Sequence, residues 1–80
     1  MAKVKEDGLA DASGLSCPMP VVKAAREMRA LQPGQILKIV ATDRGSLADI
    51  PAWAVDTGNE LLSTEHEGGR YVFLVRKGNP

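Results

Sequence analysis

The run ILKIVAT, at residues 36–42, limits the possible folds more than any other stretch of this 80-residue sequence. Branched apolar side chains fill the run and only Lys38 interrupts them, which is typical of an internal β-strand buried on both faces. An internal strand needs a neighbouring strand on each edge and a layer of side chains packed over it. The rest of the chain must therefore supply further strands and at least one covering helix.

A first helix is predicted ahead of this strand, over residues 18–31. Apolar side chains recur there at three- and four-residue spacing, which places them on one helix face: Val21, Ala24, Ala25, Met28 and Leu31. The segment Gln32-Pro33-Gly34-Gln35 then ends the helix, and Pro33-Gly34 suits the centre of a type II turn.

A second helix is predicted after the strand, over residues 46–57. Ser46 and Asp49 have the spacing of an N-terminal capping box, and Gly58 supplies the C-terminal stop. Pro51 lies inside the segment, where it belongs to the first turns of the helix or produces a kink. The predicted apolar face consists of Leu47, Ile50, Trp53, Ala54 and Thr57.

Three further strands complete the pattern. Residues 8–12 (GLADA) give a weak strand signal, whereas residues 60–66 and 71–77 indicate a hairpin around Glu67-Gly68-Gly69-Arg70. The order predicts an α+β fold: a two-layer α/β sandwich in βαβαββ order, with a four-stranded mixed sheet and both helices on one face. We expect residues 1–80 to form a single domain, with about residues 1–7 frayed.

Composition narrows the function classes. Ten Lys/Arg balance ten Asp/Glu, which removes the usual electrostatic case for binding nucleic acid or a membrane surface. The single cysteine excludes an intramolecular disulfide and a cysteine-rich zinc site. No apolar run has transmembrane length, and the opening MAKVKEDGLAD does not resemble a signal peptide. We therefore expect a cytoplasmic protein with no metal, no direct nucleic-acid partner and no membrane partner.

That single cysteine, Cys17, lies in the segment SGLSCPMP. A residue before proline is pushed out of helical geometry, and Pro18 suits the first helical position. Cys17 is therefore predicted at the N-cap, beside free amides and the positive helix end, which would lower the thiol pKa. Pro20 removes another N–H and stiffens the turn. The pattern predicts a rigid, partly exposed and reactive sulfur.

Several uses of Cys17 remain open on physical grounds. It could be a buried small hydrophobe, as lone cysteines commonly are. It could be a hydrolase nucleophile, but the only histidine, His66, lies far along the chain and nothing brings the two together. A dithiol oxidoreductase is excluded because no resolving cysteine exists. The remaining chemistry is thiol exchange or persulfide carriage, in which a partner supplies the second sulfur.

The segment ADASGLSCPMPVVKA resembles the opening of the TusA/SirA-like sulfur carrier family, in which an Asp and a Gly-Leu pair precede Cys-Pro-x-Pro at a helix start. The likeness continues through LQPGQILKIVATD, SLADIPAWA, TGNELLS and YVFLVRKG and so covers nearly the whole chain. The residues that fit the motif position by position are Asp11, Gly14, Leu15, Cys17, Pro18 and Pro20.

This resemblance implies the same βαβαββ sandwich and a function. It implies that Cys17 accepts a sulfane sulfur as a persulfide from a donor protein, such as a cysteine desulfurase or rhodanese, and passes it to a downstream acceptor protein. Pro18 and Pro20 would fix the presentation of the sulfur, and the family uses no metal or organic cofactor. The pathway stays open between tRNA thiolation, cofactor synthesis and sulfur-compound oxidation.

Two positions depart from the family pattern. Ala10 stands where many members have a large apolar residue, and Ser16 stands where many have a basic one. Ser16 therefore deprives the predicted thiolate of a cationic neighbour. The competing hypothesis is a regulatory or protein-interaction module that carries no sulfur, in which Cys17 is packed or is a redox-sensitive contact.

Other residues near the motif have two interpretations each. Lys23 and Arg26 make the first helix basic, either to dock an acidic partner or as a solvated face. Met19 is either an exposed apolar contact beside the sulfur or a packed residue. Asp11 is expected to accept hydrogen bonds from amides of the SGLS turn, and Gly14 to supply a positive φ there.

Overall fold

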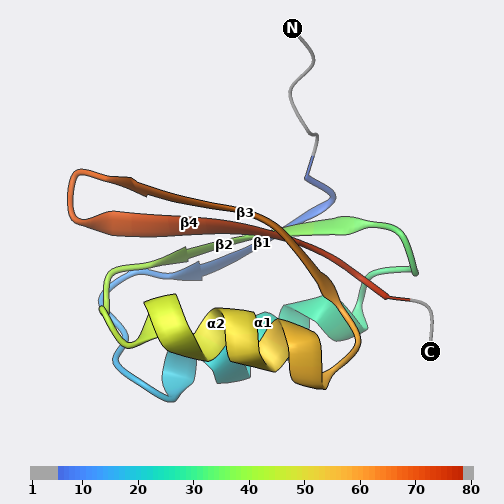
Figure 1. Ribbon diagram of the computed structural model, residues 1–80, viewed down its shortest axis with the longest axis horizontal. Helices are drawn as coiled ribbons and strands as arrows, with labels where there is room; N and C mark the ends of the chain where they lie inside the picture. The colour runs from blue at the N-terminus through green and yellow to red at the C-terminus, as the bar shows by residue number, and fades with distance from the viewer. Residues whose placement is uncertain (1–5, 79–80) are drawn as a thin grey trace, which may run out of the picture.

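The computed structural model describes residues 6–78 and has the predicted α+β architecture (Figure 1). One layer is a four-stranded sheet, and both helices pack against one of its faces. The order βαβαββ and the two-layer sandwich are confirmed. In chain order the elements are β1 (Gly8–Ala12), α1 (Met19–Arg29), β2 (Ile36–Ala41), α2 (Ser46–Asp56), β3 (Glu60–Glu67) and β4 (Arg70–Arg76).

The sheet is mixed, as predicted, and its strand order is β1-β2-β4-β3. β2 is the internal strand expected from its sequence: it pairs in parallel with β1, and antiparallel with β4. The parallel pair runs in register from Gly8 opposite Leu37 to Ala12 opposite Ala41. The carboxyl ends of β1 and β2 therefore lie side by side, and the loops that lead into the two helices start from the same edge of the sheet.

The core lies between the sheet and the helices. On β2 the side chains of Leu37, Ile39 and Ala41 are fully buried there, together with Phe73 of β4. On the opposite face of β2 only Val40 is buried, while Ile36 and Lys38 on the same face are half-buried. The expectation that β2 is buried on both faces is therefore right for one face only, because both helices cover the same side of the sheet.

α1 begins and ends slightly inside its predicted range, and Pro20, Ala24 and Met28 form its buried stripe. The turn that follows is confirmed: Gln35 N–H donates to the carbonyl of Gln32, and Gly34 has a φ of 90°. Ala24 and Met28 belong to the predicted face, and Val21 and Leu31 of that face pack partly buried against the core. Burial of Pro20 was not predicted.

α2 begins at Ser46, but the predicted capping box is absent. The N-cap residue is Gly45, and no side chain caps the helix. The Ser46 hydroxyl is buried and finds no hydrogen-bond partner among the described residues. On the predicted inner face Ile50 and Ala54 are buried and Trp53 packs against the core. Leu47 and Thr57 are exposed instead, and Ser46 is buried although it was not predicted there. Pro51 lies in the second turn of the continuous helix.

The closing hairpin is confirmed, with strand ends that differ by one residue from the prediction. Gly68 and Gly69 form the two-residue turn between paired Glu67 and Arg70. Their φ values of 59° and 79° are those that a type I′ hairpin turn requires. β3 also carries a register irregularity between Leu61 and Ser63.

The predicted fraying of about residues 1–7 lies mostly outside the described residues. Asp7, which is described, does not fit that prediction. Its N–H donates to the carbonyl of Ile36 at 2.6 Å, and its carboxylate accepts the Ile36 N–H at 2.8 Å. These two bonds hold Asp7 against the start of β2.

Candidate functional site

The loops that follow β1 and β2 meet at one edge of the sheet. The N–H of Gly14 in the first loop donates to the Thr42 hydroxyl in the second at 2.8 Å. The N–H of Cys17 donates to the Asp43 carboxylate at 3.2 Å. The region beyond the carboxyl ends of parallel strands is where α/β proteins commonly place functional groups. Cys17 is held in this region by backbone and side-chain hydrogen bonds.

The residues before Cys17 form a compact turn. Asp11 accepts the N–H of Ser13 at 3.1 Å, and the N–H of Leu15 donates to the carbonyl of Ala12 at 3.1 Å. Gly14 has a φ of 80°, in the region that favours glycine. These are the local roles predicted for Asp11 and Gly14. Leu15 is half-buried and packs against the core, which anchors the turn to the rest of the protein.

Hydrogen bonds from Ser13 lower the pKa of the Asp11 carboxyl, and the positive charges of Lys23 and Arg70 add to the effect. Asp11 is therefore ionised at neutral pH and acts as an acceptor within the turn. The arrangement agrees with a structural role for Asp11.

Cys17 lies one position further from the helix than predicted. Met19 N–H donates to the carbonyl of Ser16 at 2.9 Å, which puts Cys17 and Pro18 at the centre of a turn. The N-cap is therefore Pro18 and not Cys17, and the Cys17–Pro18 peptide bond is cis. The amides expected beside the sulfur are largely absent, because Met19 N–H is engaged in the turn and Pro20 has none.

The Cys17 thiol faces a carboxylate instead. Cys17 is exposed, and its Sγ–H donates to Oδ2 of Asp49 at 2.8 Å. This hydrogen bond raises the pKa of the Cys17 thiol, with partial loss of water and the negative charges of Asp49 and Asp43 acting in the same direction. The prediction of a lowered thiol pKa is thus wrong, because two carboxylates act on the sulfur where free amides were expected.

Gly45 makes room for the Asp43 carboxylate. A Cβ at this position would lie 2.9 Å from Oδ2 of Asp43 and 3.8 Å from Oδ2 of Asp49. Sequence reasoning missed Asp43 and Gly45 and gave Asp49 a capping role. The available signal was that Asp43 and Gly45 follow closely after the strand predicted at residues 36–42. Parallel pairing of that strand with residues 8–12 brings the two following loops to the same end of the sheet.

The first turns of the two helices carry exposed apolar side chains. Met19 is 46% exposed, which excludes the interpretation of a packed residue. Val22 and Leu47 are similarly exposed, and the sequence did not single them out for this. Further along α1, Arg26 is exposed, whereas Lys23 is half-buried and its charge acts on Asp11.

His66 does not form a catalytic pair with Cys17. Its ring packs on Tyr71 of the neighbouring strand, with the ring centroids 4.6 Å apart. The side-chain partner of Cys17 is Asp49. The hydrolase alternative therefore has no geometric support in this structure.

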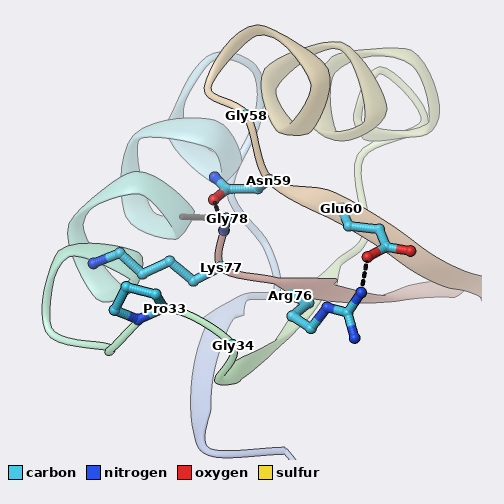
Figure 2. A pocket seen from close by; sticks show the side chains of 8 residues that line it. All are labelled: Pro33, Gly34, Gly58, Asn59, Glu60, Arg76, Lys77 and Gly78. Carbon is cyan, nitrogen blue, oxygen red and sulfur yellow. Dashed lines mark hydrogen bonds and ion pairs between the residues drawn. The ribbon is translucent and has the colours of Figure 1, made fainter. Parts of the chain in front are cut away.

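A separate open hollow of about 490 Å³ lies at the other end of α2, near Gly58 (Figure 2). Its polar groups already bind one another or nearby backbone. Arg76 forms an ion pair with Glu60, Gly78 N–H donates to Asn59 at 2.9 Å, and the Lys77 ammonium donates to the carbonyl of Leu31 at 2.6 Å. We therefore place the candidate site at Cys17.

Within the described residues, neither helix is long and apolar enough to cross a membrane.

The fold and this site define a class of small two-layer α/β proteins that present one exposed thiol on a proline-containing turn at the edge of the sheet. Residues 10–77 match the model of the family described as "Sulfurtransferase TusA", and this chain belongs to that family. It is 48% identical over 67 residues to the sulfur carrier protein TusA of Allochromatium vinosum, covering 84% of this chain and 88% of that protein.

Other relatives match over similar lengths. The sulfur carrier protein TusA of Pseudomonas aeruginosa is 42% identical over 71 residues, which cover 89% of this chain and 90% of that protein. YrkF of Bacillus subtilis is 53% identical over 68 residues, which cover 85% of this chain but 37% of YrkF. The family occurs both as proteins of about this length and as part of longer ones.

Proposed function

We propose that this protein is a sulfur carrier in which Cys17 accepts a sulfane sulfur as a persulfide and passes it to an acceptor protein. Membership of the TusA family and the names of two relatives, "Sulfur carrier protein TusA", support a carrier role. The observation that supports Cys17 as the carrying residue is its exposure in a turn held by loop-to-loop hydrogen bonds. A packed, purely structural cysteine would not be exposed.

The proposed cycle consists of two sulfur exchanges. The Cys17 thiol first loses its proton to solvent, and the resulting thiolate attacks the terminal sulfur of a donor persulfide. A bond forms between Sγ and that sulfur, the donor S–S bond breaks, and the donor leaves as a thiolate with the electron pair. An acceptor thiolate then repeats the attack on the Cys17 persulfide and releases Cys17. No net oxidant, metal or organic cofactor is needed, because each exchange conserves electrons.

The donor in this proposal is a cysteine desulfurase or a rhodanese, and the acceptor is a downstream protein. Met19 offers partners an exposed apolar contact beside the sulfur, and Lys23 and Arg26 offer positive charge further along α1. Pro18 and Pro20 fix the turn that presents Cys17. We place the carrier in the cytoplasm, where thiols are kept reduced.

Intact-mass spectrometry tests the proposal. The protein is incubated with a cysteine desulfurase and cysteine, and separately with rhodanese and thiosulfate. We expect a mass gain of one sulfur atom that a reductant removes. The variant Cys17→Ser should gain none while its circular dichroism spectrum matches that of the wild type. An unchanged mass with both donors would favour the regulatory or interaction module over the carrier.

A further inference from the structure

The hydrogen bond between the Cys17 thiol and Asp49 bears on how the carrier releases its sulfur. The hydrogen bond from Sγ to Oδ2 of Asp49 requires that Sγ hold a proton. Within the described residues, the charged groups that act on this thiol are Asp49 from α2 and Asp43 from the loop after β2. Both are acidic, so the surroundings stabilise a neutral thiol and disfavour any anion at this position.

Attachment of a second sulfur to Cys17 replaces this hydrogen bond with repulsion. Once Sγ carries a second sulfur, it has no proton to donate, and the hydrogen bond to Asp49 is lost. A persulfide is also a stronger acid than the thiol from which it forms, so its terminal sulfur bears negative charge at a pH where the thiol does not. The same carboxylate that accepts a hydrogen bond from the empty carrier therefore repels the loaded one.

We propose that Asp49 is a positioning residue that distinguishes the two states of Cys17: it stabilises the empty thiol, destabilises the persulfide and so favours release of sulfur to an acceptor. This inference rests on the proposed function and adds a direction to the transfer. Asp43 contributes charge of the same sign, but its carboxylate accepts the Cys17 N–H, which is present in both states. Asp49 is the residue whose contact with the sulfur changes on loading.

The transfer equilibrium measures this effect without a partner protein. The carrier is mixed with glutathione persulfide and glutathione at a fixed ratio, and the loaded and empty forms are counted by intact mass. The exchange forms the Sγ–S bond, breaks the S–S bond of glutathione persulfide and releases glutathione thiolate. Asp49→Asn keeps the size of the side chain and removes its charge. We expect it to raise the ratio of loaded to empty carrier by about two- to fivefold, as for a charge interaction at an exposed site.

Two variants serve as controls. Asp56→Asn removes an exposed carboxylate from the far end of the same helix and should leave the ratio at the wild-type value. Asp49→Glu retains the charge and should give a ratio nearer to the wild type than Asp49→Asn does. The pH at which iodoacetamide alkylation of Cys17 reaches half its maximal rate should fall in Asp49→Asn and stay unchanged in Asp56→Asn.

The outcomes separate this inference from the proposed function. A wild-type protein that takes up no sulfur from glutathione persulfide or from either donor enzyme contradicts both. If the wild type loads but Asp49→Asn shows an equal or lower loaded ratio, the carrier function stands and the role of Asp49 is overturned. If Asp49→Asn does not fold, Asp49→Glu takes its place in the test. A role for the negative charge requires that its ratio of loaded to empty carrier and its alkylation profile both resemble those of the wild type.

Discussion

Two opposing effects act on the sulfur of Cys17. The start of a helix favours the thiolate through its free amides and dipole, but this influence is confined to the first turn. Here Pro18 separates Cys17 from the helix, and Met19 N–H is engaged with Ser16. The hydrogen bond to Asp49 acts directly on the sulfur and favours the thiol. A direct contact with an ionised group outweighs a helix end that offers few free amides.

The pH dependence of Cys17 alkylation follows from this balance. The raised pKa predicts slow reaction with iodoacetamide at neutral pH and a half-maximal rate above the ordinary thiol pKa of about 8.5. A peptide of sequence SGLSCPMP provides the reference, because it has the same neighbours but lacks Asp49. We expect the half-maximal rate at a higher pH in the folded protein than in the peptide. A lower value would restore the helix-end activation that the sequence predicted.

The same shift affects stability. Folding stabilises the protonated thiol, so its contribution is fully present below the ordinary thiol pKa and is lost as the pH rises through the raised value. Urea denaturation midpoints of the wild type should therefore fall relative to those of Cys17→Ser over this alkaline range.

Among the elements, α1 and β1 depend on small side chains where they meet. Ala10 and Ala12 of β1 and Ala24 of α1 are all fully buried. β1 has weak strand propensity by itself, and it forms because β2 supplies its hydrogen bonds and α1 covers its inner face. Ala10, which the sequence comparison singled out as a departure, thus lies in the buried core.

Ala24→Leu tests this packing. The added atoms have no free space beside the sheet, so we expect a loss of about 1–3 kcal/mol of unfolding free energy. Ala30→Leu is the matched control: it makes the same change at the exposed end of α1 and should alter stability by less than about 0.5 kcal/mol. Urea denaturation measures both variants, and equal effects would show that the contact at Ala24 is not tightly packed.

Local patterns predicted the elements well and their ends less well. Periodicity identified both helices, and Gly68-Gly69 identified the hairpin, because these signals depend on residues close together in sequence. The Ser46–Asp49 capping box failed for a different reason. The Asp49 carboxylate accepts a hydrogen bond from Cys17, 32 positions earlier in the chain, and the Ser46 side chain is buried. Spacing alone does not show such competition.

At the scale of the whole molecule, stability rests on one small core. A domain of about this size buries roughly 60% of the surface of its unfolded chain, so each large core residue contributes a substantial fraction of the total. Phe73 is fully buried on an internal strand, between Ile39 of β2 and Thr64 of β3. It is the largest side chain with no exposure in the core.

Phe73→Ala should therefore remove about 3–5 kcal/mol of unfolding free energy, through lost burial and the cavity that remains. Thermal denaturation followed by circular dichroism provides the measurement. Val55→Ala, which truncates a side chain 76% exposed on α2, should leave the transition nearly unchanged. A transition for Phe73→Ala close to that of the wild type would contradict this assignment of the core.

Local residue patterns predicted the strands, the helices and their order, since turn chemistry and hydrophobic period are local properties. They placed Cys17 one position too close to the helix. The groups that the sulfur faces follow from contacts between segments far apart in the sequence. Parallel pairing of β1 with β2 aligns their carboxyl ends, so the Cys17 turn lies against Asp43 and the first turn of α2. The protonation state of the Cys17 thiol depends on carboxylates that strand pairing brings near it. The segment SGLSCPMP itself contains neither of these carboxylates.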